Sequence, residues 1–455
     1  MKIKLNSKNF VFFLLTLYLC LKPIIYILEH KYTGGYRIFS NDFLQQLYNH
    51  FYMEQIVFFL TFIFIAMRKI NTGKYLNVHS IRAFFLYILV VLIINLSFFD
   101  IGLLNFNYYL SPSINFICRS FLFIFLGLNI HVIDEIFQVK KMRVIFYTIA
   151  ACYVALIVVT AITDSYSTAR AWYLEGLTSS LDRSEDALTG KALFDYQYIS
   201  DTVALLLLII MSQMKSMTGK VSILFVGLFI ILLSASRTSF ICFGLAGLTL
   251  LAVLSFKVST KKMILPIALL VLLISLASIY GQFFTEKVTA QYGDTYRFAL
   301  TNYKTDGSYV FRGEIFDQRW RELEDNWLMG RYLSMYAAGR PGTYFHNWLS
   351  FWTNFGIVPF LLSVILIVSS LYRAVKQFLK DSFSPINQLL LLWSIFVVIA
   401  ISFSRSYDFY YIWFVLFGSS MIDRKLRWRG GRLPFTSQTN KRSLKRKQKI
   451  KLNFG

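Results

Sequence analysis

The sequence predicts an all-α polytopic membrane protein with about twelve transmembrane helices, and three observations carry this prediction. Hydrophobic residues make up 56% of the 455 residues and charged residues only 16%, whereas soluble domains average about 45–50% and about 25%. The hydrophobic residues gather in long runs separated by short polar segments. The runs lack the alternation of a membrane β-barrel, the other structure that satisfies its backbone in lipid. A cytosolic enzyme, a secreted disulfide scaffold and a disordered chain are therefore excluded.

Each predicted span approaches the ~20 apolar residues that cross ~30 Å of hydrocarbon as a helix, and the shorter ones are expected to be tilted or broken. Lys22 and Pro23 interrupt the first run and no small-residue cleavage site is present, so we expect a span there and not a cleaved signal peptide. The twelve runs lie near 9–28, 51–67, 82–99, 114–137, 144–163, 199–214, 220–235, 238–256, 263–283, 347–371, 386–403 and 407–421.

Basic residues decide the sidedness of the predicted spans. They precede the first span and follow the second, fourth, sixth, eighth, tenth and twelfth, so the positive-inside rule places these connections and both termini in the cytoplasm. The tail 422–455 alone holds 12 Lys/Arg against one acid, which explains much of the net charge of +23 without nucleic acid. This tail is most simply an anchor to anionic lipids or a disordered retention segment.

Four regions follow from this pattern. Residues 1–283 carry the first nine spans and an outer loop at 164–198, residues 284–346 form a long outer loop, residues 347–421 carry the last three spans, and 422–455 is the tail. The long loop is rich in aromatic residues, so we expect it to fold, to be helical around 312–325 and to cap an outward-facing cavity.

Several chemistries lack the residues that they need. The four cysteines lie within apolar runs and form no CxxC pair, and no two of the five histidines have the spacing of metal ligands. No Walker A sequence and no GxGxxG that opens a helix is present. We therefore expect no metal, no cofactor and no nucleotide.

The first candidate site segment is Ser234–Ser239, a tight outer turn between two spans in which Ser236 and other hydroxyls surround Arg237. A cation at membrane depth usually faces a cavity or a partner, and hydroxyl donors beside it suit a phosphate. The alternative is an interfacial arginine that snorkels to lipid headgroups.

The second segment is the predicted helix around 312–325, where Arg312, Phe316 and Arg319 share one face. The alternative is a solvated amphipathic helix with surface ion pairs. The third segment is His346-Asn347, at the outer start of the tenth span. A lone histidine is usually a satisfied polar residue, yet imidazole is also the usual general base near neutral pH.

The ordered set of motifs resembles the O-antigen polymerase and O-antigen ligase superfamily of bacterial membrane glycosyltransferases, of the Wzy/WaaL type. In order they are a span ending in S-x-S-R-T, a long outer loop opening with R-x-x-I-aromatic, an L-x-G element at Leu328–Gly330, and His-Asn entering a span with aromatic-Gly-Ile. The resemblance covers about 220–365. Phe316 stands where the family usually has Trp, and Asn354 where it has an acid.

The resemblance implies a GT-C-like enzyme of the bacterial inner membrane with a periplasmic active site, without metal and with inversion of the anomer. The donor would be an oligosaccharide on undecaprenyl pyrophosphate, the acceptor a glycan, and a chain-length regulator protein a possible partner. Arg237 and Arg312 would bind the pyrophosphate, with Arg319 and Asn347 beside them, and His346 would accept the acceptor's proton.

Two further outer positions are weaker candidates. Arg405, in the outer turn before the last span, is a candidate for phosphate or a sugar acid, or else a headgroup anchor. Asp195 and Gln197 are candidates to position the acceptor.

The sequence favours a polymerase, which extends another lipid-linked repeat unit, over a ligase that transfers the glycan to lipid A-core. A polysaccharide flippase or secondary transporter is the alternative from another class. It predicts charges within many spans, whereas Glu54 and Arg119 are the clearest mid-span charges here.

Overall fold

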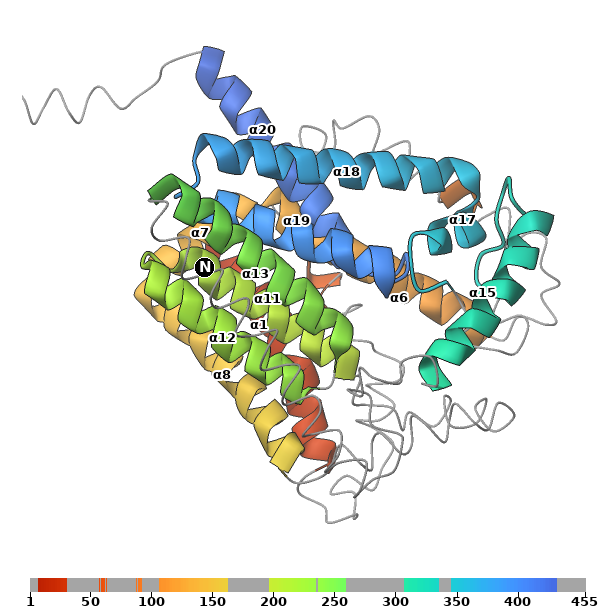
Figure 1. Ribbon diagram of the computed structural model, residues 1–455, viewed down its shortest axis with the longest axis horizontal. Coiled ribbons are helices and arrows are strands. Elements are labelled where there is room, and N and C mark those ends of the chain that lie inside the picture. The colour runs from red at the N-terminus through yellow and green to blue at the C-terminus, as the bar shows by residue number, and fades with distance from the viewer. Residues whose placement is uncertain are drawn as a thin grey trace, which may run out of the picture.

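The computed structural model describes residues 7–30, 57, 59–61, 63, 87, 89–91, 106–162, 196–234, 236–258, 307–334 and 345–431. Within these ranges the chain is helical and has no strand (Figure 1). The helices are α1 (Ser7–His30), α6 (Phe106–Leu128), α7 (Ile130–Gln138), α8 (Lys140–Ile162), α11 (Tyr196–Gln213), α12 (Met217–Leu233), α13 (Arg237–Val258), α15 (Gly307–Asp325), α17 (Leu349–Phe355), α18 (Ile357–Lys380), α19 (Pro385–Phe403) and α20 (Tyr411–Gly431).

Among the described residues, four stretches of helix are long and apolar enough to cross a bilayer, and they lie in α8, α13, α18 and α19. The bent pair α6 and α7 makes a fifth candidate, and α1, α11, α12 and α20 contain shorter apolar stretches. The predicted class, a helical membrane protein, is thus confirmed. The number twelve stays a prediction, since the run at 263–283 and most of those at 51–67 and 82–99 fall outside the described residues.

Two of the predicted spans that the structure describes are broken. The run at 114–137 bends by 66° between α6 and α7, where the Asn129 side chain donates to the Phe125 carbonyl oxygen at 2.8 Å and competes with the helical pattern. The run at 347–371 divides into α17 and α18 at Gly356, whose φ of 88° suits glycine.

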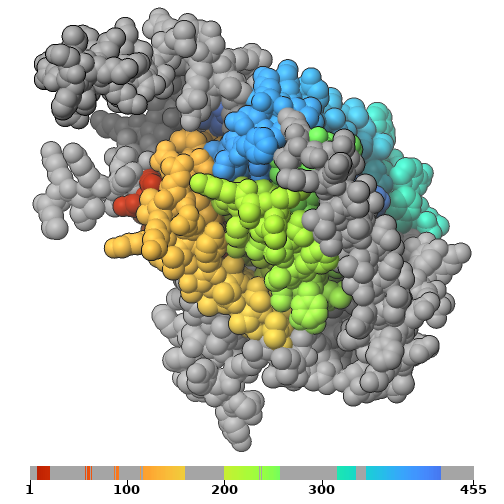
Figure 2. Space-filling model, turned by 60° about the vertical axis from the view of Figure 1, so that its left-hand side comes forward, coloured from red at the N-terminus to blue at the C-terminus, as the bar shows by residue number. Residues whose placement is uncertain are grey.

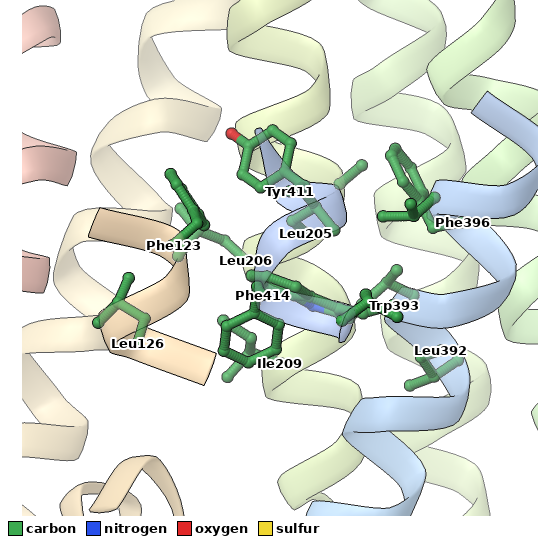
Figure 3. Packing of buried hydrophobic residues seen from close by; sticks show 14 of the residues in the cluster. Phe123, Leu126, Leu205, Leu206, Ile209, Leu392, Trp393, Phe396, Tyr411 and Phe414 are labelled. Carbon is green, nitrogen blue, oxygen red and sulfur yellow. The ribbon is translucent and has the colours of Figure 1, made fainter. Parts of the chain in front are cut away.

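The centre of the bundle is built by α19 and α20. Trp393 of α19 lies 4.3 Å from Phe414 of α20, measured between ring centroids, and Leu205, Leu206 and Ile209 of α11 lie beside them (Figure 3). Close helix contact depends on Gly127 of α6, where a Cβ atom would lie 2.7 Å from the Phe414 carbonyl oxygen of α20. The yellow surface of α8 packs against the green helices α11 and α12 (Figure 2).

Two predicted features lie at one end of the bundle, and a buried lysine lies at the other. The turn from α12 to α13 is as short as the sequence predicts, because α12 ends at Leu233 and α13 begins at Arg237. The predicted helix around 312–325 is present as α15, which lies beyond the end of α18 and beside α17 (Figure 1). At the opposite end, Lys220 is buried and donates to the Met211 carbonyl oxygen and to Gln388.

Candidate functional site

Polar side chains converge at the end of the bundle where α11 begins, α12 ends, α13 begins and α19 ends. Ser200 and Asp201 lie in the second turn of α11, and both are buried. The Ser200 hydroxyl lies 2.5 Å from that of Ser234, which follows α12. The basic connections around Lys215 and Lys380 lie at the far ends of α11 and α18. The polar cluster and these basic residues therefore occupy opposite ends of the bundle.

A buried ion pair forms the centre of this cluster. The Arg405 guanidinium donates from Nε to Oδ2 of Asp201 at 2.8 Å and from Nη2 to Oδ1 at 3.1 Å. Asp201 is 4% exposed and Arg405 7% exposed. Such a bidentate pair offsets part of the desolvation of both charges, because it supplies directed hydrogen bonds as well as Coulomb attraction.

Serine hydroxyls complete the coordination of this pair. Ser239 donates to Oδ1 of Asp201 at 2.6 Å, and the Ser236 and Ser239 hydroxyls are 2.7 Å apart. Arg405 Nη1 donates to the Ser404 hydroxyl at 3.1 Å. The cluster therefore links α11, the first turn of α13 and the turn after α19 in one network.

Local backbone signals explain why these residues meet. Ser236 lies directly before α13, its carbonyl oxygen accepts from Phe240 N at 3.0 Å, and its hydroxyl accepts from Ser239 N at 3.4 Å, as an N-cap residue does. At the end of α19 the Ala400 carbonyl oxygen accepts from the backbone N of both Ser404 and Arg405. This closes the helix and turns Arg405 back towards α11.

The segment that carries His346 is attached to the same turn. The Trp348 indole donates to the Ser402 hydroxyl at 2.9 Å, and Tyr407 N donates to the Ser350 hydroxyl at 2.8 Å. His346 itself is half-buried. Two hydrogen bonds on either side of Arg405 thus fix the position of the segment that follows His346.

Asn347 has a local structural contact. Its side-chain oxygen accepts from Leu349 N at 2.9 Å, and its backbone oxygen accepts from the Ser350 hydroxyl at 2.7 Å. These bonds lie at the start of α17 and order the turn after His346. The Asn347 side-chain oxygen is therefore already occupied by a backbone donor in this conformation.

Arg319 of α15 faces the protein and is 4% exposed. Its Nη1 donates to Glu322 and to the Ser334 hydroxyl, the latter at 3.0 Å. Leu333 N then donates to the Asn354 side-chain oxygen at 3.1 Å. Arg319 therefore connects α15 to the turn at Leu333 and Ser334, which is hydrogen-bonded to α17.

The structure brings together four of the predicted site residues. Ser236 and Arg405 belong to the network around Asp201, and His346 and Asn347 lie on the segment that this turn holds. The side chains of Arg237 and Arg312 lie outside the described residues, although their backbones place them at the start of α13 and within α15.

The other expectations about the outer face remain untested. The long loop 284–346, which is expected to cap an outward-facing cavity, includes 284–306 and 335–344, and these fall outside the described residues, as do Asp195 and the Gln197 side chain.

Sequence reasoning missed Asp201, although it considered Asp195 and Gln197 a few residues earlier. A signal was present, because Asp201 is an acid inside an apolar run and such a charge needs a partner. The separation of 204 residues from Arg405 left that partner unidentified.

A row of tyrosines extends the polar region into the bundle. The Tyr411 hydroxyl lies 3.2 Å from the Thr202 hydroxyl, next to Asp201 in the chain. Tyr18 donates to Tyr410 at 3.0 Å, and the Arg119 guanidinium carbon lies 5.4 Å from the centre of the Tyr410 ring. This mid-span arginine is therefore placed over an aromatic ring beside the network, where the ring face stabilises its charge.

Fold and site together define an all-helical membrane protein with a hydrogen-bonded polar cluster at one end of its bundle. No family model matches the chain, and no curated protein or solved structure matches it. The resemblance to O-antigen polymerases and ligases accordingly depends on the sequence motifs alone.

Proposed function

We propose that this chain is a membrane glycosyltransferase of the O-antigen polymerase type, which transfers a glycan from undecaprenyl pyrophosphate onto another lipid-linked repeat unit. The observation that carries the proposal is that one turn, which contains Arg405 and Tyr407, holds both the network of Ser236 and Asp201 and the segment after His346. It supports the proposal because residues chosen from separate motifs lie at the same end of the bundle. We place that end in the periplasm of a bacterial inner membrane, since the basic connections lie at the other end.

His346 is the proposed general base. The acceptor hydroxyl oxygen attacks the anomeric carbon from the face opposite the pyrophosphate, a new C–O bond forms, and the bond to the leaving oxygen breaks with inversion. Undecaprenyl pyrophosphate departs with the bonding electron pair, and the imidazole of His346 takes the hydroxyl proton. His346 is half-buried, so the residue reaches the protein surface, where an acceptor would bind.

The arginines divide into two roles in this proposal. Arg237 and Arg312 bind the pyrophosphate and neutralise the charge that develops as the C–O bond breaks. Arg405 and Arg319, whose guanidinium groups already bond to Asp201 and Glu322, act as positioning residues for the two outer turns.

Glycan profiling tests this function in a strain from which the gene is deleted. The strain is complemented with wild type, His346→Ala or Arg237→Ala, and membrane levels of each variant are measured. Matched controls are His131→Ala in α7 and Arg143→Ala in α8, which replace the same residue types outside the polar cluster. We expect the deletion to leave lipid A-core with one repeat unit, the two site variants to fail to restore the ladder, and both controls to restore it.

Other outcomes identify other functions. Bare core together with accumulated long lipid-linked chains would make the protein a ligase, the second candidate. Repeat units retained on the cytoplasmic side of the membrane would make it a flippase. Wild-type ladders from both site variants at normal membrane levels would refute the assigned site.

A further inference from the structure

The turn after α15 presents three consecutive large apolar side chains to the outside. Trp327 is 55% exposed, Leu328 51% and Met329 38%. A run of exposed apolar residues in a folded segment usually marks an interaction surface. We call these three residues the apolar turn.

Backbone contacts hold the apolar turn against the beginning of α18. Ile357 N, in the first turn of α18, donates to the carbonyl oxygens of Trp327 at 3.2 Å and Leu328 at 3.3 Å. The indole of Trp352 donates to the Trp327 carbonyl oxygen at 2.7 Å. At Gly356 a Cβ atom would lie 2.1 Å from the Leu328 carbonyl oxygen, so the two backbones are in direct contact. The apolar turn therefore stays at the level of Ile357.

The helix that the apolar turn contacts has one broad exposed apolar face. The face contains side chains spaced three or four residues apart, from 44% to 64% exposed: Val358, Leu361, Ile365, Val368 and Tyr372. A helix stripe of this kind in an apolar span is the face that contacts lipid. The apolar turn lies directly beside the N-terminal end of this helix, because its carbonyl oxygens accept from Ile357 N, next to Val358.

The length of α18 places Ile357 relative to the bilayer. The basic end of α18 begins at Arg373, and the ammonium of Lys376 one turn further on lies 5.8 Å from the centre of the Tyr372 ring. From Ile357 there are sixteen steps of ~1.5 Å to Arg373 and nineteen to Lys376, or about 24 and about 28 Å. Both lengths approach the ~30 Å of a hydrocarbon core, since long basic side chains reach the headgroups from a few ångströms inside it. With Lys376 at one headgroup region, Ile357 lies at the other boundary, where tryptophan is enriched.

We propose that the apolar turn enters the headgroup region of the outer leaflet, and that its partner is the lipid surface. Trp327, Leu328 and Met329 then anchor the end of α15 to the bilayer, so that α15 lies along the membrane surface above the ends of the spans. The continuity of the apolar turn with the exposed face of α18 selects lipid as the occupant. This proposal is independent of the proposed enzymatic function.

Spin-label accessibility tests the proposal in the full-length protein, reconstituted in nanodiscs of phosphatidylethanolamine and phosphatidylglycerol. The four native cysteines are replaced by alanine, and single labels are introduced by Leu328→Cys, Val358→Cys and Glu324→Cys. Val358 is the lipid reference on α18, and Glu324 is an exposed polar position near the end of α15. Power saturation compares collisions with oxygen, which partitions into lipid, and with a neutral nickel chelate, which stays in water.

We expect the Leu328 label to show an oxygen-to-nickel accessibility ratio near that of Val358 and several-fold above that of Glu324. Met329→Cys provides a second reading if Leu328→Cys does not reconstitute. A ratio equal to that of Glu324 would mean that the apolar turn stands in water, and would overturn the proposal. Protection from both reagents would also overturn it, because a protein surface or a second copy of the chain would then cover the turn.

Discussion

Removing one partner of the Asp201–Arg405 pair should destabilise the protein more than removing both. In Arg405→Met, Asp201 loses two guanidinium hydrogen bonds, at 2.8 and 3.1 Å, and keeps the bond from Ser239. Because Asp201 is 4% exposed, water does not replace the lost partner. Breaking a buried ion pair in this way costs about 3–5 kcal/mol.

The double variant Asp201→Ala/Arg405→Met leaves no unpaired charge. The remaining loss comes from the hydroxyls of Ser239 and Ser404, which each lose one partner at about 1 kcal/mol per bond. We therefore expect the double variant to lose about 2 kcal/mol, less than either single variant. The two substitutions are strongly non-additive if the contact is as the structure shows it.

The assay is equilibrium unfolding by SDS in mixed micelles, followed by tryptophan emission, for which the buried Trp393 and Trp413 are reporters. Arg321→Met is the matched control, since Arg321 is exposed on α15 and should change the free energy of unfolding by less than about 0.5 kcal/mol. A loss under about 1 kcal/mol in Arg405→Met, or additive losses in the double variant, would refute the reasoning.

Two further predictions concern backbone contact and buried charge. Gly356→Ala should lower the free energy of unfolding by at least about 1–3 kcal/mol, since φ is 88° and a Cβ atom meets the Leu328 carbonyl oxygen. Gly244→Ala, inside α13 with its nearest contact at 3.4 Å, should be neutral or stabilising by up to about 1 kcal/mol, and equal losses would contradict this account. Gln388→Leu should cost about 1.5–3 kcal/mol, because it leaves the buried Lys220 ammonium with one acceptor. The single variant Lys220→Met removes the buried charge itself. Its loss of unfolding free energy in the same assay should be smaller than that of Gln388→Leu, and a larger loss would refute the reasoning.

Hydropathy alone predicted the helices where apolar runs end sharply. The run at 386–403 corresponds to α19 (Pro385–Phe403), with Pro385 in the first turn where proline is tolerated. The short turn at Ser234–Ser239 was predicted for the same reason. The positions of the breaks in the runs at 114–137 and 347–371 could not be predicted from hydropathy. Hydropathy does not report a local hydrogen bond such as that from Asn129 to Phe125, or the positive φ of Gly356.

The sequence predicted the members of the polar cluster better than their contacts. The order of the motifs and their sidedness put Ser236 and His346 at one end of the bundle, and sidedness alone adds Arg405; the structure places the three in connected segments. What a charge pairs with depends on tertiary packing, so Arg405 was considered a candidate for phosphate while its partner in the structure is Asp201. Arg319 is likewise a candidate for pyrophosphate because it shares a helix face with Arg312, and in the structure its buried side chain donates to Glu322.

An arginine that is already paired with a buried carboxylate has a different role from a residue that contacts the substrate. The guanidinium of Arg405 is held by a buried carboxylate, so a substrate phosphate could reach it only by displacing Asp201, at a cost of several kcal/mol. Its contribution is then indirect, through the turn that fixes Tyr407 on Ser350 and the Trp348 indole on Ser402. If the chain has the proposed activity, loss of Arg405 should reduce stability and activity together, whereas loss of His346 should remove activity from a folded protein. The difference between these two variants separates positioning from chemistry at this end of the bundle.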